Sequence, residues 1–340
     1  MTSFMAAEVA EIPAAAARFL DLSANAVRQA ATALRKDDPA LFVTVARGSS
    51  DHAATYFKYA AELLAGVPVA SVGPSIASIY GRPLRLGRAA CVGISQSGRS
   101  PDIVEMMRAA GAGGALTIAI TNFADAPMAQ ASAHCLPLQA GQEKSVAATK
   151  TFVTSVLAGV ALLAEWQDDK ELRDAVAGLP EAFEKALALD WSALGGRLAR
   201  AQSLYVLGRG PGFAIASEAA LKFKETCGLH AEAYSAAEVL HGPSAIVQAR
   251  FPVLALGVED AALPHVVATA ERLAAQGADV YLTGAEAKGV VTLPSVPGLH
   301  PLVAPLVLAV SFYAFIESLA WRRGFDPDTP PHLRKVTETL

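Results

Sequence analysis

The chain has 340 residues, of which 53% are hydrophobic and 18% are charged, and its formal net charge is −4. Because a disordered chain is poor in apolar residues and rich in charge, this composition excludes disorder as the main state. The slight negative charge does not attract a polyanion, so we expect no nucleic-acid partner and expect any anionic ligand to be held locally by amides and hydroxyls. At about 150 residues per domain, the length predicts two domains.

Two apolar runs, residues 301–316 and 152–164, raise the question of a membrane. Neither reaches the ~18 uninterrupted apolar residues of a membrane-spanning helix, so we predict two buried helices and no membrane association. The amino terminus lacks a basic region and carries Glu8 and Glu11, which is not typical of a signal peptide.

The cysteines and histidines indicate a reduced compartment and no metal site. An odd number of cysteines without a Cys-x-x-Cys pair is typical of a cytoplasmic protein, and here they are Cys91, Cys135 and Cys227. The seven histidines are scattered without the spacing of metal ligands. We therefore expect a cytoplasmic protein without a metal.

The first half of the chain alternates predicted strands with predicted helices. The segment before the first strand, roughly 40 residues long, is expected to form an amphipathic, alanine-rich helix. Strands are then expected at 41–48, 67–73, 89–95 and 115–121, and helices at 51–64, with Ser50 as its N-cap, and at 101–111. This alternation predicts an α/β fold with a parallel sheet and helices on both of its faces.

The second half repeats this order. Its first strand, 203–210, aligns with the strand at 41–48 so that Arg209 matches Arg47 and Gly210 matches Gly48. A helix over 214–226 follows, and later segments again read as strand, helix and strand, at 251–258, 266–277 and 279–284. We predict a first domain over 1–190, a second over 191–323 and an irregular tail over 324–340.

The residues Ser95–Ser100, with the sequence SQSGRS, follow a predicted strand and precede a helix. Ligands of open parallel sheets bind at the carboxyl ends of strands, where a helix start presents free N–H groups. The segment therefore predicts a phosphate-binding loop, and the alternative is an ordinary serine-rich loop. The matching segment Gly257–Asp260 is acidic, with Glu259 and Asp260, and would repel an anion. We therefore expect one ligand site per chain.

The helix over 214–226 carries Glu218, Lys222 and Glu225 at positions i, i+4 and i+7, which places them on one face. Buried, these charges would be costly unless they are paired or used in chemistry. The alternative is a solvent-exposed i,i+4 ion pair.

Together, GSS at 48–50, SQSGRS, EKSVAATK at 143–150, EAALKFKET at 218–226, LHGP at 240–243 and the terminal KVTETL resemble the sugar isomerase (SIS) domain family of phosphosugar enzymes. Within that family they are similar to the isomerase half of glucosamine-6-phosphate synthase and to the stand-alone SIS-type glucosamine-6-phosphate deaminases. The resemblance covers about residues 40–340 and implies two tandem flavodoxin-like SIS domains.

The resemblance also implies roles for single residues. Glu225 matches the base that moves a proton between carbons 1 and 2 of the sugar, His241 the histidine that opens the ring, and Lys335 the lysine that can form a Schiff base. The implied phosphate-binding and sugar-binding residues are Ser50, Ser95, Gln96, Ser97, Ser100, Val146, Ala147 and Lys150, and we place Glu218 and Lys222 with them. Without the resemblance, Lys150 and Lys335 would read as solvated lysines and His241 as a structural or exposed histidine.

The activity implied is conversion of glucosamine 6-phosphate to fructose 6-phosphate and ammonia, without cofactor, by a homodimer in which His241 reaches the neighbouring subunit's site. Alternatives are a galactosamine-6-phosphate deaminase or sugar-amine deglycase, the isomerase part of a glutamine-dependent aminotransferase whose glutaminase is missing or separate, and a non-catalytic sugar-phosphate-binding protein. Two departures from the synthase pattern stand out: Arg99-Ser100 replaces an acid and a threonine, and Pro74-Ser75 replaces a Ser-Glu pair.

Overall fold

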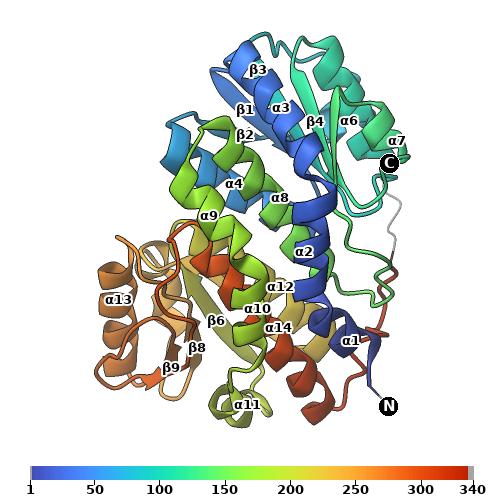
Figure 1. Cartoon of the computed structure of the whole chain (residues 1–340). Helices are drawn as coiled ribbons and strands as arrows, with labels where there is room; N and C mark the ends of the chain where they lie inside the picture. The colour runs from blue at the N-terminus through green and yellow to red at the C-terminus, as the bar shows by residue number, and fades with distance from the viewer. Residues whose placement is uncertain (1, 336–340) are drawn as a thin grey trace. The chain divides into compact units, whose positions relative to one another are not determined.

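A computed structural model describes residues 2–335 (Figure 1). The chain forms two compact units, each assembled from segments distant in sequence. The first unit consists of residues 12–143, 150–178 and 334–335, and the second of 2–11, 144–149 and 179–333. Each unit contains one parallel five-stranded sheet, which confirms the predicted α/β class.

The first unit contains a sheet with the strand order β2-β1-β3-β4-β5. Its strands are β1 (Leu41–Val45), β2 (Val69–Ser71), β3 (Ala89–Ile94), β4 (Leu116–Thr121) and β5 (His134–Pro137). Its helices are α2 (Ile12–Leu22), α3 (Ala24–Asp37), α4 (Ser49–Ala65), α5 (Ser75–Ser78), α6 (Pro101–Ala112), α7 (Pro127–Gln130), α8 (Lys150–Trp166) and α9 (Lys170–Ala177).

Neighbouring residues of β1 show that helices cover both faces of this sheet. Phe42 packs edge-on against Phe57 of α4 and Trp166 of α8, with ring centroids 5.2 and 5.3 Å away. Val43, on the opposite face, lies in the apolar cluster that includes Met107 of α6. Because successive side chains of a strand point to opposite faces, α4 and α8 cover one side and α6 the other.

The second unit contains a sheet with the order β10-β9-β8-β6-β7. Its strands are β6 (Ser203–Gly208), β7 (His230–Ser235), β8 (Pro252–Ala255), β9 (Asp279–Leu282) and β10 (Val291–Thr292). Its α-helices are α1 (Phe4–Ala10), α10 (Leu179–Leu187), α11 (Ser192–Leu198), α12 (Pro211–Cys227), α13 (Leu263–Ala275) and α14 (Ala304–Arg322), and two short 3₁₀ helices span Glu238–Leu240 and Pro243–Ile246.

The two sheets have the same topology. Numbered from its own first strand, each runs 2-1-3-4-5, which is the flavodoxin-like order. The turn after the first strand is repeated as well: Gly48 has φ 55° and ψ −134°, and Gly210 has φ 57° and ψ −135°. These positive φ angles are open to glycine at little cost. The repeat seen in the sequence is therefore a repeat of backbone geometry.

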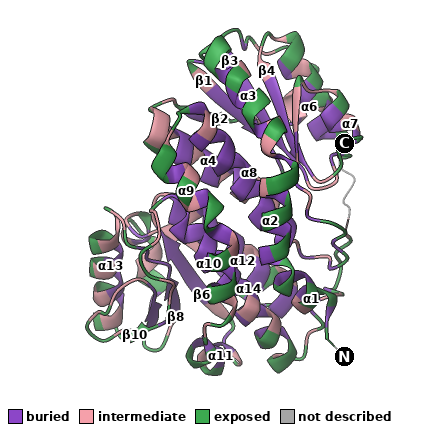
Figure 2. Ribbon diagram, viewed as in Figure 1, coloured by how far each residue is buried: buried purple, intermediate pink, exposed green. Residues whose placement is uncertain are grey.

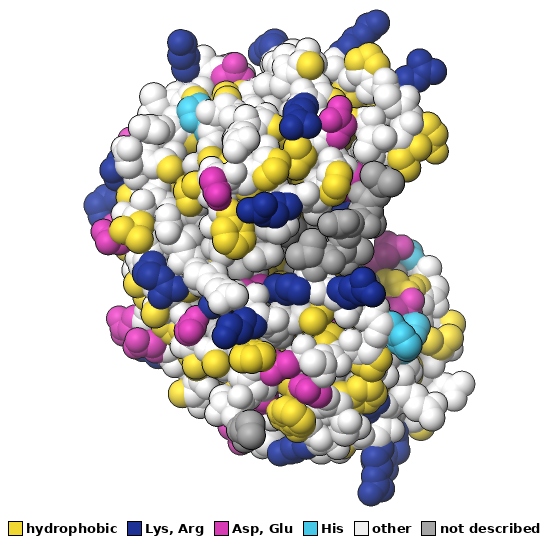
Figure 3. Space-filling view, turned by 90° about the vertical axis from the view of Figure 1, so that its right-hand side faces the viewer, with side chains coloured by type: hydrophobic (Ala, Val, Ile, Leu, Met, Phe, Trp, Pro, Cys, Tyr) yellow, Lys and Arg dark blue, Asp and Glu magenta, His cyan; other side chains and the backbone are white. Residues whose placement is uncertain are grey.

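The apolar runs are core helices. By length and composition α14 is long enough to cross a membrane, with a mean hydropathy of 1.6, but 78% of its apolar window is buried inside the fold. The central strands β1, β3, β4, β6 and β8, and helix α8, are also largely buried (Figure 2). Basic and acidic side chains are interspersed on the face shown in Figure 3.

One sequence-based expectation about elements is wrong, and three strands were not predicted. The single amino-terminal helix is instead α1, α2 and α3, because Pro13 fits only the first turn of a helix and Ser23 interrupts the next one, where its Oγ donates to the Pro137 carbonyl at 2.6 Å. The segment before His241, which shows no regular period, contains β7. As an edge strand that is only partly buried, β7 lacks a continuous apolar run. β5 and β10, short edge strands, were also not predicted.

Candidate functional site

The carboxyl ends of β1 and β3 lie side by side in the first unit. In a sheet of this order the connections leave these two strands in opposite directions, and a ligand is expected in the gap between them. β1 leads through Arg47 and Gly48 into α4, and β3 leads through Ser95–Ser100 into α6. The structure thus brings Ser50 and the predicted phosphate loop to neighbouring strand ends.

The loop after β3 is held by hydrogen bonds along its backbone. The amide of Gly98 donates to the carbonyl oxygen and to Oγ of Ser95, both at 3.2 Å. The carbonyl of Gln96 accepts the amide of Asn122 at 3.1 Å. Ser100 is the N-cap residue of α6, yet its side chain makes no capping hydrogen bond. The loop therefore has a fixed shape, and the Ser100 hydroxyl does not satisfy the helix start itself.

Gly98 is required by the geometry of this loop. Its φ is +61°, and an added Cβ would lie 2.7 Å from Ala126 Cβ and 2.7 Å from Thr121 Oγ1. Both the backbone conformation and the close approach of neighbouring atoms exclude a side chain here without rearrangement.

Ser50 lies inside the first turn of α4, so its predicted role as N-cap is wrong. The helix begins at Ser49, with Gly48 as the N-cap. The positive φ of Gly48 turns the chain directly out of β1, and the helix starts two residues earlier than the sequence indicates. Ser50 is half-buried near the amino end of α4, where N–H groups and the helix dipole favour an anion.

Arg47 and Asp102 form an ion pair that the sequence did not predict. Nε and Nη2 of Arg47 donate to Oδ2 of Asp102 at 3.0 and 2.8 Å. The Asp102 side chain is fully buried in the first turn of α6, whereas that of Arg47 is 53% exposed. The pair links the segment after β1 to the start of α6. The Arg-Gly repeat draws attention to Arg47, but no short sequence pattern pairs this residue with Asp102.

A second group of polar residues surrounds the loop before α8. Oε1 of the buried Glu143 accepts the amide of Thr151 at 3.1 Å, and its Oε2 accepts Thr151 Oγ1 at 2.6 Å. Nζ of Lys335 reaches the same Oε2 at 2.8 Å and is 25% exposed. Lys150, the first residue of α8, is buried and donates to the carbonyl of Gln142 at 2.7 Å. Both lysines are thus held, and the reading of Lys150 as a solvated lysine is wrong.

Asn122 connects this group to the phosphate loop within the first unit. Its amide donates to Gln96, its Nδ2 donates to the Gly141 carbonyl at 2.7 Å, and its Oδ1 accepts the Ala140 amide at 3.0 Å. The backbone amide and the side chain of this one residue after β4 therefore fix the segment before Glu143 relative to the phosphate loop.

In the second unit, α12 carries a buried group of charges. Nζ of the fully buried Lys222 lies 3.2 Å from Oε1 of Glu218 and pairs with Oε2 of Glu225. The Glu225 side chain is 21% exposed, and Glu218 also accepts a hydrogen bond from Tyr313. Burial alone lowers the pKa of Lys222, but the carboxylates of Glu218 and Glu225 together raise it above its ordinary value. The alternative of a solvent-exposed pair is wrong.

The remaining predicted residues of the second unit differ in exposure. His241 is exposed and directly follows the 3₁₀ helix Glu238–Leu240. Ala147 is buried and Val146 is half-buried, in the segment 144–149.

The cysteines and potential metal ligands suggest no further chemistry. Burial raises the pKa of Cys91 to about 12 and the pKa values of Cys135 and Cys227 to about 11. Such thiols stay protonated near neutral pH and are poor nucleophiles. Across residues 2–335, no three His, Cys, Asp or Glu side chains are grouped to hold a metal ion.

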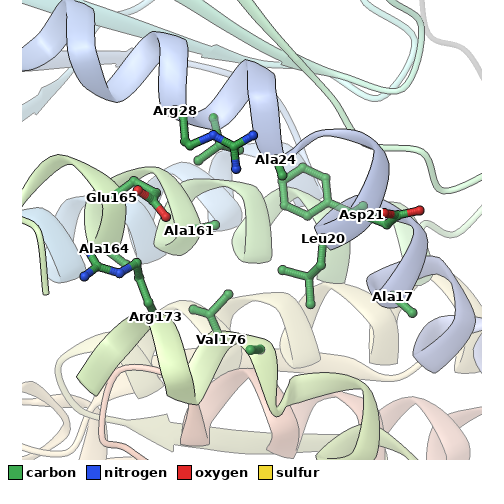
Figure 4. Close-up of a pocket in the computed structure, with 13 residues that line it drawn as sticks. Ala17, Leu20, Asp21, Ala24, Arg28, Ala161, Ala164, Glu165, Arg173 and Val176 are labelled. Atoms are coloured by element: carbon green, nitrogen blue, oxygen red, sulfur yellow. The ribbon is translucent and has the colours of Figure 1, made fainter. Parts of the chain in front are cut away.

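A pocket of about 440 Å³ lies among α2, α3, α8 and α9 of the first unit (Figure 4). Its walls are mainly apolar, with Arg28, Glu165 and Arg173 on one side and Asp21 on the other. At ~1.5 Å per residue, the part of α8 that lines it is about 16–23 Å from Lys150. The pocket contains none of the predicted site residues, and we assign it no role.

Comparison with known proteins identifies the family. The model of the SIS domain matches residues 34–165 and 197–289. The chain belongs to the SIS domain family. The resemblance noted from the motifs is thereby confirmed.

Among solved SIS structures, a protein from Silicibacter pomeroyi DSS-3, provisionally named a phosphosugar isomerase, has a TM-score of 0.93 and 52% identity, over 96% of this chain and 100% of that one. The C-terminal domain of glucosamine-fructose-6-phosphate aminotransferase from Francisella tularensis has a TM-score of 0.86 and 25% identity, over 97% and 99% of the two chains. The isomerizing glutamine–fructose-6-phosphate aminotransferase of Aeropyrum pernix is 34% identical over 86% of this chain and 50% of its own. This SIS chain thus spans about half the length of the curated relatives it matches.

Proposed function

We propose that this SIS chain is a phosphosugar enzyme that converts glucosamine 6-phosphate and water to fructose 6-phosphate and ammonia. The observation that carries the proposal is Glu225, a partly exposed carboxylate fixed by the fully buried ammonium of Lys222. A carboxylate that is fixed in position and partly exposed can reach a proton of a bound substrate and act as a general base. The names of the relatives, which concern isomerization and amination of hexose 6-phosphates, support the substrate class.

The phosphate is assigned to the loop Ser95–Ser100 and to the start of α4 with Ser50. These elements offer hydroxyls, helix-terminal amides and a glycine that allows close approach. The binding needs no metal, because neutral donors and two helix dipoles face the same strand ends. Val146, Ala147 and Lys150 are assigned to the sugar.

The chemistry assigned to Glu225 is a proton transfer between carbons 1 and 2. His241 opens the sugar ring by passing a proton between the ring oxygen and the hydroxyl at carbon 1. In the open-chain aldehyde, Glu225 removes the proton from carbon 2, which gives an enolamine, and returns it to carbon 1, which gives an imine at carbon 2. Hydrolysis of that imine, by water directly or after exchange onto the amine of Lys335, releases ammonia and leaves the ketone.

We also propose a homodimer in which His241 serves the partner's site. Glu225→Gln and His241→Ala would each be inactive alone. After subunits of the two variants are mixed and allowed to exchange, about a quarter of the sites would hold both native residues if the site is shared between subunits. Recovery of ammonia release on mixing supports this arrangement, and no recovery at full subunit exchange contradicts it.

The direct test is ammonia release from glucosamine 6-phosphate, measured with a coupled dehydrogenase. Glu225→Gln should lower kcat at least about 100-fold, the range typical for loss of a general base. Glu181→Gln, which changes an exposed carboxylate on α10, is the control and should leave kcat unchanged. The proposal fails if the wild type releases no ammonia, or if Glu225→Gln retains the wild-type rate.

A second candidate is the isomerase part of a glutamine-dependent aminotransferase, which the match to half of the Aeropyrum pernix enzyme favours. It predicts that the chain forms glucosamine 6-phosphate from fructose 6-phosphate only with a glutaminase partner and glutamine. Testing galactosamine 6-phosphate and sugar-amine adducts in the ammonia assay separates the remaining substrates.

A further inference from the structure

The core helix α14 sends one hydroxyl into the charged group of α12. Tyr313 Oη donates to Oε1 of Glu218 at 2.9 Å. The side chains of Glu218 and Lys222 are at most 1% exposed, and Tyr313 is fully buried as well. A buried hydroxyl in an apolar helix is costly unless it is hydrogen-bonded, and here its partner is a carboxylate of the candidate catalytic group.

The contacts form a chain that ends at Glu225. Oε1 of Glu218 receives both the Tyr313 hydroxyl and, at 3.2 Å, the ammonium of Lys222. The same ammonium pairs with Oε2 of Glu225. Two carboxylates thus share one buried ammonium, and the position of each of these three side chains depends on the next.

Within this group, the hydroxyl of Tyr313 contacts the carboxylate that has almost no contact with solvent. A donor directed at a carboxylate fixes its side-chain rotamer. Glu218 is thereby kept in place, Lys222 is held between two acceptors, and the proton-accepting role falls to the more exposed Glu225.

We infer that Tyr313 is a positioning residue for proton transfer, acting through Glu218 and Lys222 on Glu225. This inference rests on the proposed role of Glu225 as the base. Tyr313 lies within the apolar run 301–316 and outside every motif, so its role could not be predicted from the sequence.

The test replaces Tyr313 by phenylalanine, which keeps the ring and removes only the hydroxyl. The control is Tyr281→Phe on β9, another buried tyrosine of the same unit, which belongs to no candidate site. Two rates are measured: ammonia release from glucosamine 6-phosphate, and exchange of the carbon-1 hydrogen of fructose 6-phosphate in deuterated water. For Tyr313→Phe we expect kcat and the exchange rate to fall about tenfold, with KM within twofold of the wild type. Tyr281→Phe should leave both rates unchanged.

A double variant separates positioning from general loosening of the core. If Tyr313 acts through Glu218, adding Tyr313→Phe to Glu218→Gln should cause no further loss, because the two changes lie on one path. The inference is overturned if the rate losses of the two single variants multiply in the double variant. It is also overturned if the exchange rate of Tyr313→Phe lies within twofold of the wild type. If the wild type exchanges hydrogen but releases no ammonia, the proposed reaction is wrong, and the exchange rate still tests the role of Tyr313. A wild type that exchanges no hydrogen overturns both.

Discussion

Substitution of Gly98 by alanine tests whether the phosphate loop depends on the shape described above. Two separate penalties apply at this position. The first is the left-handed backbone, φ +61°, which costs a residue with a Cβ about 1–2 kcal/mol. The second is overlap, because the new Cβ would lie 2.7 Å from atoms of Thr121 and Ala126, and forced overpacking typically costs about 1–3 kcal/mol.

A matched glycine isolates the second penalty. Gly66 ends α4 with φ +66°, and an added Cβ there meets nothing within 4 Å. Gly66→Ala should therefore lose only the conformational part, about 1–2 kcal/mol, whereas Gly98→Ala should lose about 2–5 kcal/mol in total. Both glycines lie in the first unit, so the same unfolding transition reports on both.

Urea unfolding of the two variants gives the difference directly, and calorimetric titration with inorganic phosphate gives the effect on the loop. Since the Gly98 carbonyl accepts the Met128 amide at 3.0 Å, relief of the overlap must shift the loop or α7. We expect phosphate affinity to fall at least about tenfold, or ~1.4 kcal/mol, in Gly98→Ala and to stay unchanged in Gly66→Ala. Equal stabilities within about 0.5 kcal/mol, the scatter of ordinary surface changes, would refute the steric argument. Unchanged phosphate affinity would refute the location of the site.

Three further changes probe the ion pairs. Asp102→Asn should cost about 1–2 kcal/mol in urea unfolding, less than a fully buried pair, because the half-exposed Arg47 left behind stays solvated. Glu143→Gln removes the charge that pairs with Lys335; trypsin should then cleave after Lys335 several-fold faster, as followed by mass spectrometry, and an unchanged rate would contradict the pairing. Lys222→Met leaves the buried Glu218 and the partly exposed Glu225 without their cation and should cost about 3–5 kcal/mol at pH 8. Because the folded-state pKa of Lys222 is raised, the lysine's own contribution is fully present below its ordinary value and is lost only at more alkaline pH. If the stability difference between the wild type and Lys222→Met is smaller at pH 5 than at pH 8, the decrease must then come from protonation of carboxylates in the variant. Urea midpoints at the two pH values measure this difference.

The fold was largely predictable because local sequence patterns indicate its elements. Alternating apolar strands and helices predict a parallel α/β sheet, and the Arg-Gly repeat at Arg47 and Arg209 indicates two copies of it. The errors lie where local pattern carries little information. β7 is a partly buried edge strand, and the start of α4 is set by the torsion angle of Gly48 rather than by a capping side chain.

The candidate site was predictable only where its residues are adjacent in sequence. The phosphate loop and the spacing of Glu218, Lys222 and Glu225 can be recognised from the chain alone. Asp102 with Arg47, and Tyr313 with Glu218, join residues 55 and 95 positions apart. Such pairs arise from tertiary packing, which no short pattern in a single sequence indicates.

The repeat itself explains why only one half is expected to hold the phosphate. Both sheets have the same strand order, and both first strands end in an Arg-Gly turn with nearly identical torsion angles, so each unit offers the same gap at its strand ends. What differs is the segment after the third strand: Ser95–Ser100 presents hydroxyls and amides, whereas Gly257–Asp260 presents two carboxylates. Charge repulsion disfavours a phosphate dianion at the latter by several kcal/mol at the dielectric of a partly buried site. The two units thus provide similar scaffolds, and we expect the sign of the charge after the third strand to decide which of them can bind the anion.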